Sequence, residues 1–132
     1  MRFLLTLSAA GLLTAQIPDF TPPTPLFRAI LRHDAAEVRR LLASGASPSE
    51  GNFLGFQPVF VPIFNENPEI FLALADKGAD LNALDASGST TLMWAAATET
   101  GDTRILDELL ARGADPNVRN KAGETALDWA IR

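Results

Sequence analysis

Few side chains in this sequence could carry out chemistry. The 132 residues include no cysteine and one histidine, His33, which excludes disulfides, thiolate metal clusters and multi-histidine zinc sites. Sixteen Asp and Glu residues remain, and glycoside hydrolysis requires two carboxylates at a suitable separation. The pair Asp107-Glu108 lies between apolar residues at helical spacing, which indicates a solvated helix face. We therefore expect no catalytic residue, no cofactor and no metal, and keep a carboxylate-pair hydrolase only as an alternative.

The charge balance argues against nucleic acid and anionic lipid as partners. The chain carries 16 acidic residues against 11 Lys and Arg, which gives a net charge of −5. Phosphate-rich partners attract clusters of basic residues, and the sequence has no such cluster and no Gly-rich phosphate loop. The function class that remains is binding of another protein.

The first 15 residues have the three parts of a secretory signal peptide. Arg2 precedes an apolar run at residues 3–13, and Thr14-Ala15 follows it. A bilayer-spanning helix needs about 20 apolar residues, so this run is too short. We expect cleavage after Ala15 and export to the periplasm or outside the cell, with no membrane contact afterwards; a buried first helix and an uncleaved anchor are the alternatives. Residues 16–23 are rich in proline and predict an extended linker.

The rest of the chain repeats at intervals of 33 to 35 residues. Glycine commonly closes a helix at positive φ, and an apolar helical pattern precedes each of the pairs Gly45-Ala46, Gly78-Ala79 and Gly113-Ala114. Four helix starts recur as well, at Thr24-Pro25, Gln57-Pro58, Thr90-Thr91 and Thr125-Ala126. Three of these starts offer a threonine hydroxyl to the free N–H groups of the first turn. Each unit is therefore predicted to be a turn, a helix, a loop and a second helix.

These motifs resemble the ankyrin repeat. The third unit carries them most clearly, with Gly88, Thr90, Leu92, Ala95-Ala96 and the turn Gly113-Ala114-Asp115-Pro116-Asn117. The resemblance implies an all-α fold, a solenoid of stacked helix-loop-helix units with projecting β-turns. It covers residues 24–132 in about three and a half repeats, at about 24–56, 57–89, 90–124 and 125–132. It also implies protein recognition through turn tips and the concave helix face, without intrinsic chemistry.

The helices and interhelix loops depart from the family pattern in three ways. The histidine of the family's T-P-L-H motif is replaced by Phe27, Phe60, Met93 and Asp128, so we expect apolar packing in three units. Pro62 stands inside the first helix of the second unit, so we expect that helix to begin late or to be partly irregular. Two extra residues around 98–100 lengthen the interhelix loop of the third unit.

The candidate partner-binding residues lie at the turn tips and on the neighbouring helix face. Phe53, Leu54 and Phe56 occupy a turn that is usually polar in the family, and they either form an exposed patch or fold back over the core. Trp94 has an equivalent in Trp129, which also fits packing between repeats. The remaining candidates are Asp85, Ser87, Thr98, Glu99, Asn120 and Lys121.

The last unit, residues 125–132, contains only a first helix. Leu127, Trp129 and Ile131 would leave apolar surface uncovered there. Either the half-unit serves as a cap, or it pairs with a partner or a second copy, or the sequence is truncated. We expect an exported, bacterial-type ankyrin-repeat adaptor or inhibitor that binds a protein, and the alternative is a structural accessory of an envelope complex.

Overall fold

The computed structural model describes residues 22–98 and 100–131, and these residues form helices and connecting turns. The predicted signal peptide, most of the predicted linker, and Glu99 lie outside the described residues. In chain order the helices are α2 (Pro25–Leu31), α3 (Ala35–Ala43), α4 (Phe60–Phe64), α5 (Pro68–Asp76), α6 (Thr91–Ala96), α7 (Arg104–Ala111) and α8 (Ala126–Ala130). No β-strand occurs in these two ranges, and the predicted all-α class is confirmed.

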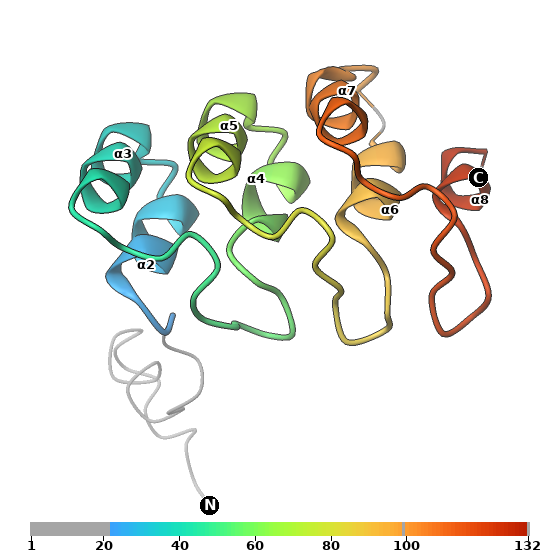
Figure 1. The fold of residues 1–132 in the computed structure, drawn as a ribbon, viewed down its shortest axis with the longest axis horizontal. Helices are drawn as coiled ribbons and strands as arrows, with labels where there is room; N and C mark the ends of the chain where they lie inside the picture. Colours follow the sequence, from blue (N-terminus) through green and yellow to red (C-terminus); the bar gives the residue numbers. More distant parts are fainter. Residues whose placement is uncertain (1–21, 99, 132) are drawn as a thin grey trace, which may run out of the picture.

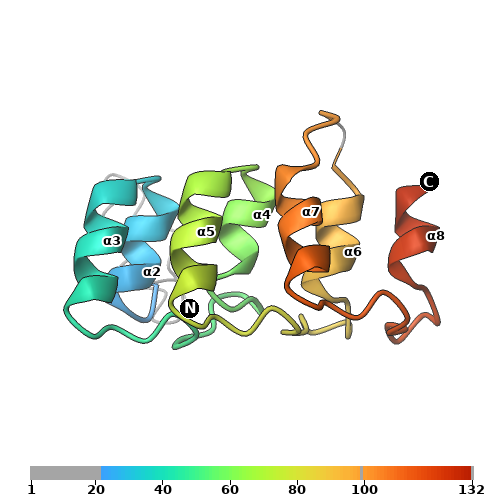
Figure 2. The same ribbon diagram turned by 45° about the horizontal axis from the view of Figure 1, so that its top comes forward.

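The helices stack in two layers (Figures 1 and 2). α2 packs on α3, α4 on α5 and α6 on α7, and each pair contacts the next along the chain. The inner layer consists of α2, α4, α6 and α8, and the outer layer of α3, α5 and α7. The turns that connect successive pairs project from one edge (Figure 1). None of the helices in the described ranges is long and apolar enough to cross a membrane.

Threonine side chains start three of the four inner helices. Thr24, Thr90 and Thr125 each accept a hydrogen bond from the backbone N–H three residues later, at 3.0, 3.1 and 3.4 Å. These bonds satisfy donors that the first turn of a helix leaves unpaired. The predicted starts at these three positions are therefore confirmed.

α4 begins later than its equivalents. Its N-cap residue is Val59, which provides no side-chain hydrogen bond, and the chain before it turns through bonds from Phe60 N to Gln57 O and from Val61 N to Pro58 O. The late start places Pro62 third in the helix, where a missing N–H breaks no intrahelical bond. The expected effect of the proline is confirmed.

The outer helices end as the glycines predict. Gly45, Gly78 and Gly113 adopt φ values of +103°, +91° and +88° directly after the helix C-caps. The alanine after each glycine donates to a carbonyl five residues earlier, at 2.9 to 3.0 Å. This pattern is the Schellman motif, which needs a left-handed residue that glycine supplies without a steric cost.

The core runs through the stack along the inner helices. Phe27, Phe60 and Met93, which replace the family's histidine, are 0% exposed. Apolar packing at these positions is therefore confirmed. In α8 the equivalent Asp128 is exposed and accepts from Thr125 N at 2.8 Å, so it caps its own helix instead of entering the core.

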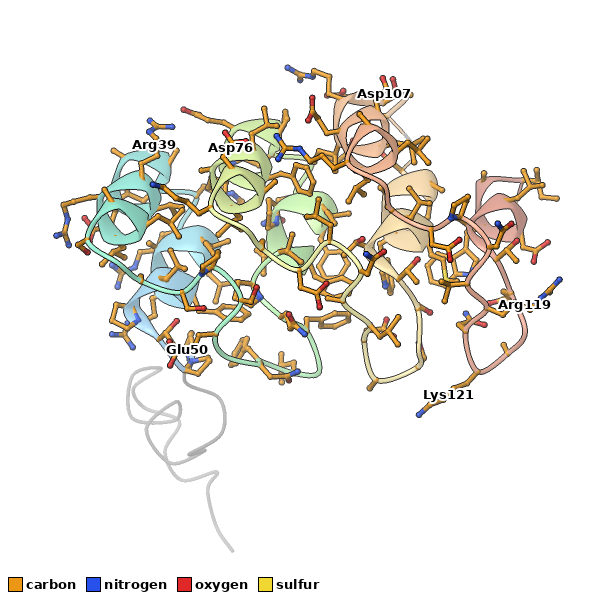
Figure 3. All side chains as sticks on the ribbon, viewed as in Figure 1. Arg39, Glu50, Asp76, Asp107, Arg119 and Lys121 are labelled. Atoms are coloured by element: carbon orange, nitrogen blue, oxygen red, sulfur yellow. The ribbon has the colours of Figure 1, made fainter. Side chains whose placement is uncertain are left out.

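Ion pairs join the outer helices of neighbouring units. Arg39 of α3 pairs with Glu69 of α5 at 2.7 Å, and Arg112 at the end of α7 pairs with Asp76 of α5 at 2.7 Å. Figure 3 shows Arg39 and Asp76 on this outer layer. Both pairs are largely exposed, so each contributes about 0–1 kcal/mol. Apolar stacking, and not surface charge, holds the units together.

Candidate functional site

Two adjoining pockets open on the inner face, which we define as the surface of α2, α4, α6 and α8 away from the outer layer. The first, here the apolar pocket, has a volume of about 280 Å³ and is lined by Phe27, Leu31, Phe53, Leu54, Phe56, Val61, Phe64 and Asn65. The second, here the acidic pocket, has a volume of about 410 Å³ and is lined by Ile63, Phe64, Glu66, Trp94, Ala97 and Thr98. Phe64 lines both pockets, so they form one surface across α2, α4 and α6.

A tight hairpin builds one wall of the apolar pocket. Phe53 N donates to Phe56 O at 2.9 Å and Phe56 N donates to Phe53 O at 3.1 Å, which closes a two-residue turn. Leu54 and Gly55 at its tip have φ values of +56° and +89°, the positive pair that such hairpins require. Leucine rarely adopts this conformation. The turn holds Leu54 outward, where its side chain is 68% exposed.

The two phenylalanines of this hairpin pack inward. The Phe53 ring lies 5.7 Å from Phe27, and Phe56 lies 5.4 Å from Phe60, 4.9 Å from Phe64 and 6.1 Å from Trp94, all in edge-to-face geometry. Each such contact stabilises by about 0.5–1.5 kcal/mol beyond the area that it buries. The two expectations for this turn therefore each hold for part of it: Phe53 and Phe56 fold back over the core, and Leu54 is exposed.

The two tryptophans lie against each other between α6 and α8. Their ring centroids are 4.9 Å apart at an interplanar angle of 77°. Trp94 Nε1 donates to Asp85 at 2.9 Å, and Trp129 Nε1 donates to Glu124 at 3.0 Å. Each indole thus donates to a carboxylate of the turn before its own helix, at non-equivalent positions of the repeat, and both bonds agree with a packing role, although Trp94 also reaches the acidic pocket.

The Asp85 side chain is occupied within its own turn. Its carboxylate accepts from Ser87 N at 2.8 Å, Ser87 Oγ at 2.8 Å and Ser89 N at 2.9 Å, in addition to the Trp94 indole. Burial raises the pKa of Asp85, but these hydrogen bonds lower it by more, so the pKa lies below its ordinary value. Asp85 therefore stays ionised and braces the turn.

Polar tips of neighbouring turns also bind each other. Lys121 N donates to Ser87 O at 3.0 Å, and Lys121 Nζ donates to Ala86 O at 2.9 Å. Asn120 Nδ2 donates to Ser89 Oγ at 3.1 Å. Figure 3 shows Lys121 at the projecting edge of the stack. These candidate residues lie together, apart from the two pockets, and their polar groups join one turn to the next.

A larger groove lies in the outer layer between α5 and α7. Its volume is about 760 Å³, and it is lined by Asn67, Pro68, Glu69, Phe71, Leu72, Arg104, Ile105, Asp107 and Glu108. Three of its four charged residues are in ion pairs, Glu69 with Arg39, Arg104 with Asp102 at 2.7 Å, and Glu108 with Arg112 at 3.0 Å; the fourth, Asp107, accepts from Thr103 at 3.1 Å. The inner face offers more unpaired apolar surface, so we place the candidate site there.

A family model described as ankyrin repeats (many copies) matches residues 72–130. Residues 72–130 are ankyrin repeats. The match begins within α5 and runs to the end of α8, and α2 to α4 repeat the same arrangement before it. A search of curated proteins returned no match. Ankyrin repeats generally mediate protein–protein interactions and are typically not catalytic.

Sequence reasoning missed several residues of this surface, among them Phe64 and Glu66. Phe64 stands seven residues after Gln57, as Leu31 does after Thr24, so repeat alignment could have found it. Glu66 accepts from Thr98 at 2.7 Å, and the two residues are 32 positions apart. No local pattern indicates that contact, because only stacking of the ankyrin units brings the two loops together.

Proposed function

We propose that this chain is an exported ankyrin-repeat adaptor or inhibitor that holds a protein partner on its inner face. The adjoining pockets carry the proposal, because their rim exposes apolar side chains of Leu31, Leu54 and Phe64. Exposed apolar groups that cluster around a pocket are typical of protein interfaces. In this proposal residues 24–132 form a solenoid of about three and a half repeats, and the turn tips border the interface.

The proposed export rests on the amino-terminal sequence. Arg2 and the apolar run at residues 3–13 support a signal peptide over residues 1–15, followed by a linker over residues 16–23. The mature chain then acts in the periplasm or outside the cell. Amino-terminal sequencing of the exported protein should return Gln16 as the first residue, and a chain that still begins at residue 1 or 2 would contradict the proposal.

A second contact surface lies on α8. Leu127 is 69% exposed, whereas the equivalent residues Leu26, Val59 and Leu92 are buried. Ile131 is 74% exposed in the same half-unit. We propose that two chains associate through these side chains. Size-exclusion chromatography over a range of concentrations should show a dimer that Leu127→Asp abolishes, and a monomer at every concentration would exclude it.

Affinity capture tests the inner-face interface. Leu54→Asn removes the most exposed apolar side chain of the rim, and asparagine accepts positive φ more readily than leucine does. The matched control is Leu110→Asn on α7, where the leucine is 48% exposed in the outer layer. The partner should be lost with Leu54→Asn and retained with Leu110→Asn. Equal recovery with both variants would remove this face from the interface.

The partner's own activity separates the two roles. An isolated enzyme or toxin whose activity falls on mixing supports an inhibitor. Unchanged activity in a stable complex supports the alternative, a structural accessory of an envelope complex. The family's usual role as a non-catalytic binding module supports both over a hydrolase.

A further inference from the structure

Glu66 presents one carboxylate oxygen to the acidic pocket. Thr98 Oγ1 donates to Glu66 Oε1 at 2.7 Å, and Thr100 Oγ1 donates to the same oxygen. Within the described ranges no hydrogen bond reaches Oε2, and no basic side chain pairs with Glu66. The two threonines belong to the lengthened loop of the third unit. They are positioning residues that fix the carboxylate and leave one oxygen available.

The walls of the acidic pocket favour a cation. The rings of Phe64 and Trp94 lie 4.9 Å apart at an angle of 75°. Asp85 does not line the pocket, and its carboxylate is already hydrogen-bonded within its own turn, but it accepts from the Trp94 indole at 2.9 Å and so places a negative charge next to this wall. Aromatic rings attract cations, and the Glu66 carboxylate, which forms no ion pair within the described ranges, strengthens that attraction.

The adjoining apolar pocket has the opposite character. Its lining contains no charged residue, and Asn65 is the only amide among its eight side chains. Leu31, Leu54 and Phe64 form its exposed rim. A single segment that lies across α4 therefore meets an apolar cavity on one side of Phe64 and a negatively charged one on the other.

We propose that the inner face binds a segment of a partner protein that carries a large apolar side chain next to an arginine. The apolar side chain fills the apolar pocket, and the guanidinium enters the acidic pocket, donates to Glu66 Oε2 and stacks against the aromatic wall. Arginine suits both contacts, because its planar group donates to carboxylates and stacks on rings. This inference rests on the proposed function and adds the chemistry of the partner.

A random library of displayed 12-residue peptides, selected against the full chain, tests the inference. Enriched peptides should contain an arginine near a large apolar residue. A synthetic enriched peptide should bind about tenfold more weakly to Glu66→Gln, the size of one charge-assisted hydrogen bond at a partly exposed site. Glu50→Gln, the same charge change in an exposed turn outside both pockets, is the matched control and should leave the affinity unchanged.

A change in the peptide avoids any effect on folding of the protein. Citrulline in place of the arginine keeps the shape and removes the charge, so it should weaken binding about tenfold to the unmodified chain and have little further effect with Glu66→Gln. Enrichment of acidic or purely apolar peptides, enrichment of none, or independent effects of the two changes would overturn the inference. Peptides that bind without these effects but lose affinity with Leu54→Asn would leave the proposed function standing.

Discussion

Replacement of Phe56 by alanine should destabilise the fold although the residue lies in a projecting turn. The ring contacts Phe60, Phe64 and Trp94 at centroid distances of 5.4, 4.9 and 6.1 Å, so its loss removes one side of an aromatic cluster. The neighbouring Leu54 is 68% exposed and contributes little to the core. The pair Phe56→Ala and Leu54→Ala therefore compares an inward and an outward side chain of one hairpin.

The expected magnitude follows from burial and from the ring contacts. Phe→Ala substitutions in full cores cost about 3–5 kcal/mol, and Phe56 is only partly buried, so we expect a loss of about 2–3 kcal/mol. For a domain of this size such a loss lowers the Tm by roughly 10–15 °C. Leu54→Ala should change stability by no more than about 0.5 kcal/mol.

Urea and thermal unfolding followed by circular dichroism at 222 nm measure both variants. Tryptophan emission gives a second signal, because Trp94 is one of the contacts of Phe56. Equal midpoints for Phe56→Ala and Leu54→Ala would refute the argument, because they would mean that the Phe56 ring does not pack in the cluster.

Three further predictions concern helix caps, glycines and acid stability. Thr90→Ala should lower the free energy of unfolding in urea by about 1 kcal/mol, because Thr90 accepts a hydrogen bond from Met93 N. Thr103→Ala should lower it by less than half of that, because the Thr103 side chain makes no cap hydrogen bond at the start of α7. Gly88→Ala and Gly113→Ala should lower the Tm by similar amounts, because both glycines adopt positive φ, at +75° and +88°, and neither new Cβ would approach another atom more closely than 3.4 Å. The pKa of Asp85 is lowered in the fold, so its stabilising effect is complete above the ordinary value of 3.8 and is lost as the pH falls through the lowered pKa. Asp85→Asn should therefore reduce the loss of stability on the acid side, measured by unfolding at a series of pH values. Parallel curves of stability against pH for the two proteins would contradict this.

The sequence predicted the elements of the fold because the signals are local. A threonine cap, a closing glycine and a helical apolar pattern act within a few residues of one another, and Pro62 indicated the late start of α4 in the same way. Repetition at 33 to 35 residues then indicated which elements are equivalent. Pairing of the helices followed from that equivalence.

The site could be predicted only in part because its pockets form between units. Phe53, Leu54 and Phe56 are all large apolar residues, so the sequence does not distinguish them. Only the geometry of the turn directs the two phenylalanines inward and Leu54 outward. Asp85 stays a predicted partner contact, and the sequence did not indicate that its carboxylate binds its own turn. Glu66 resembles any other surface acid until Thr98 approaches from the next unit.

The late start of α4 couples ligand binding to local order. This helix has five residues, lacks a side-chain cap, and lies between the two pockets, so its opening should require less free energy than opening of the capped helices on either side. A segment bound across Phe64 suppresses this local unfolding, and ordering of α4 costs part of the binding free energy. Amide hydrogen exchange should therefore slow most at residues 60–66 on binding, and substitutions that stiffen α4 should raise affinity without touching the ligand.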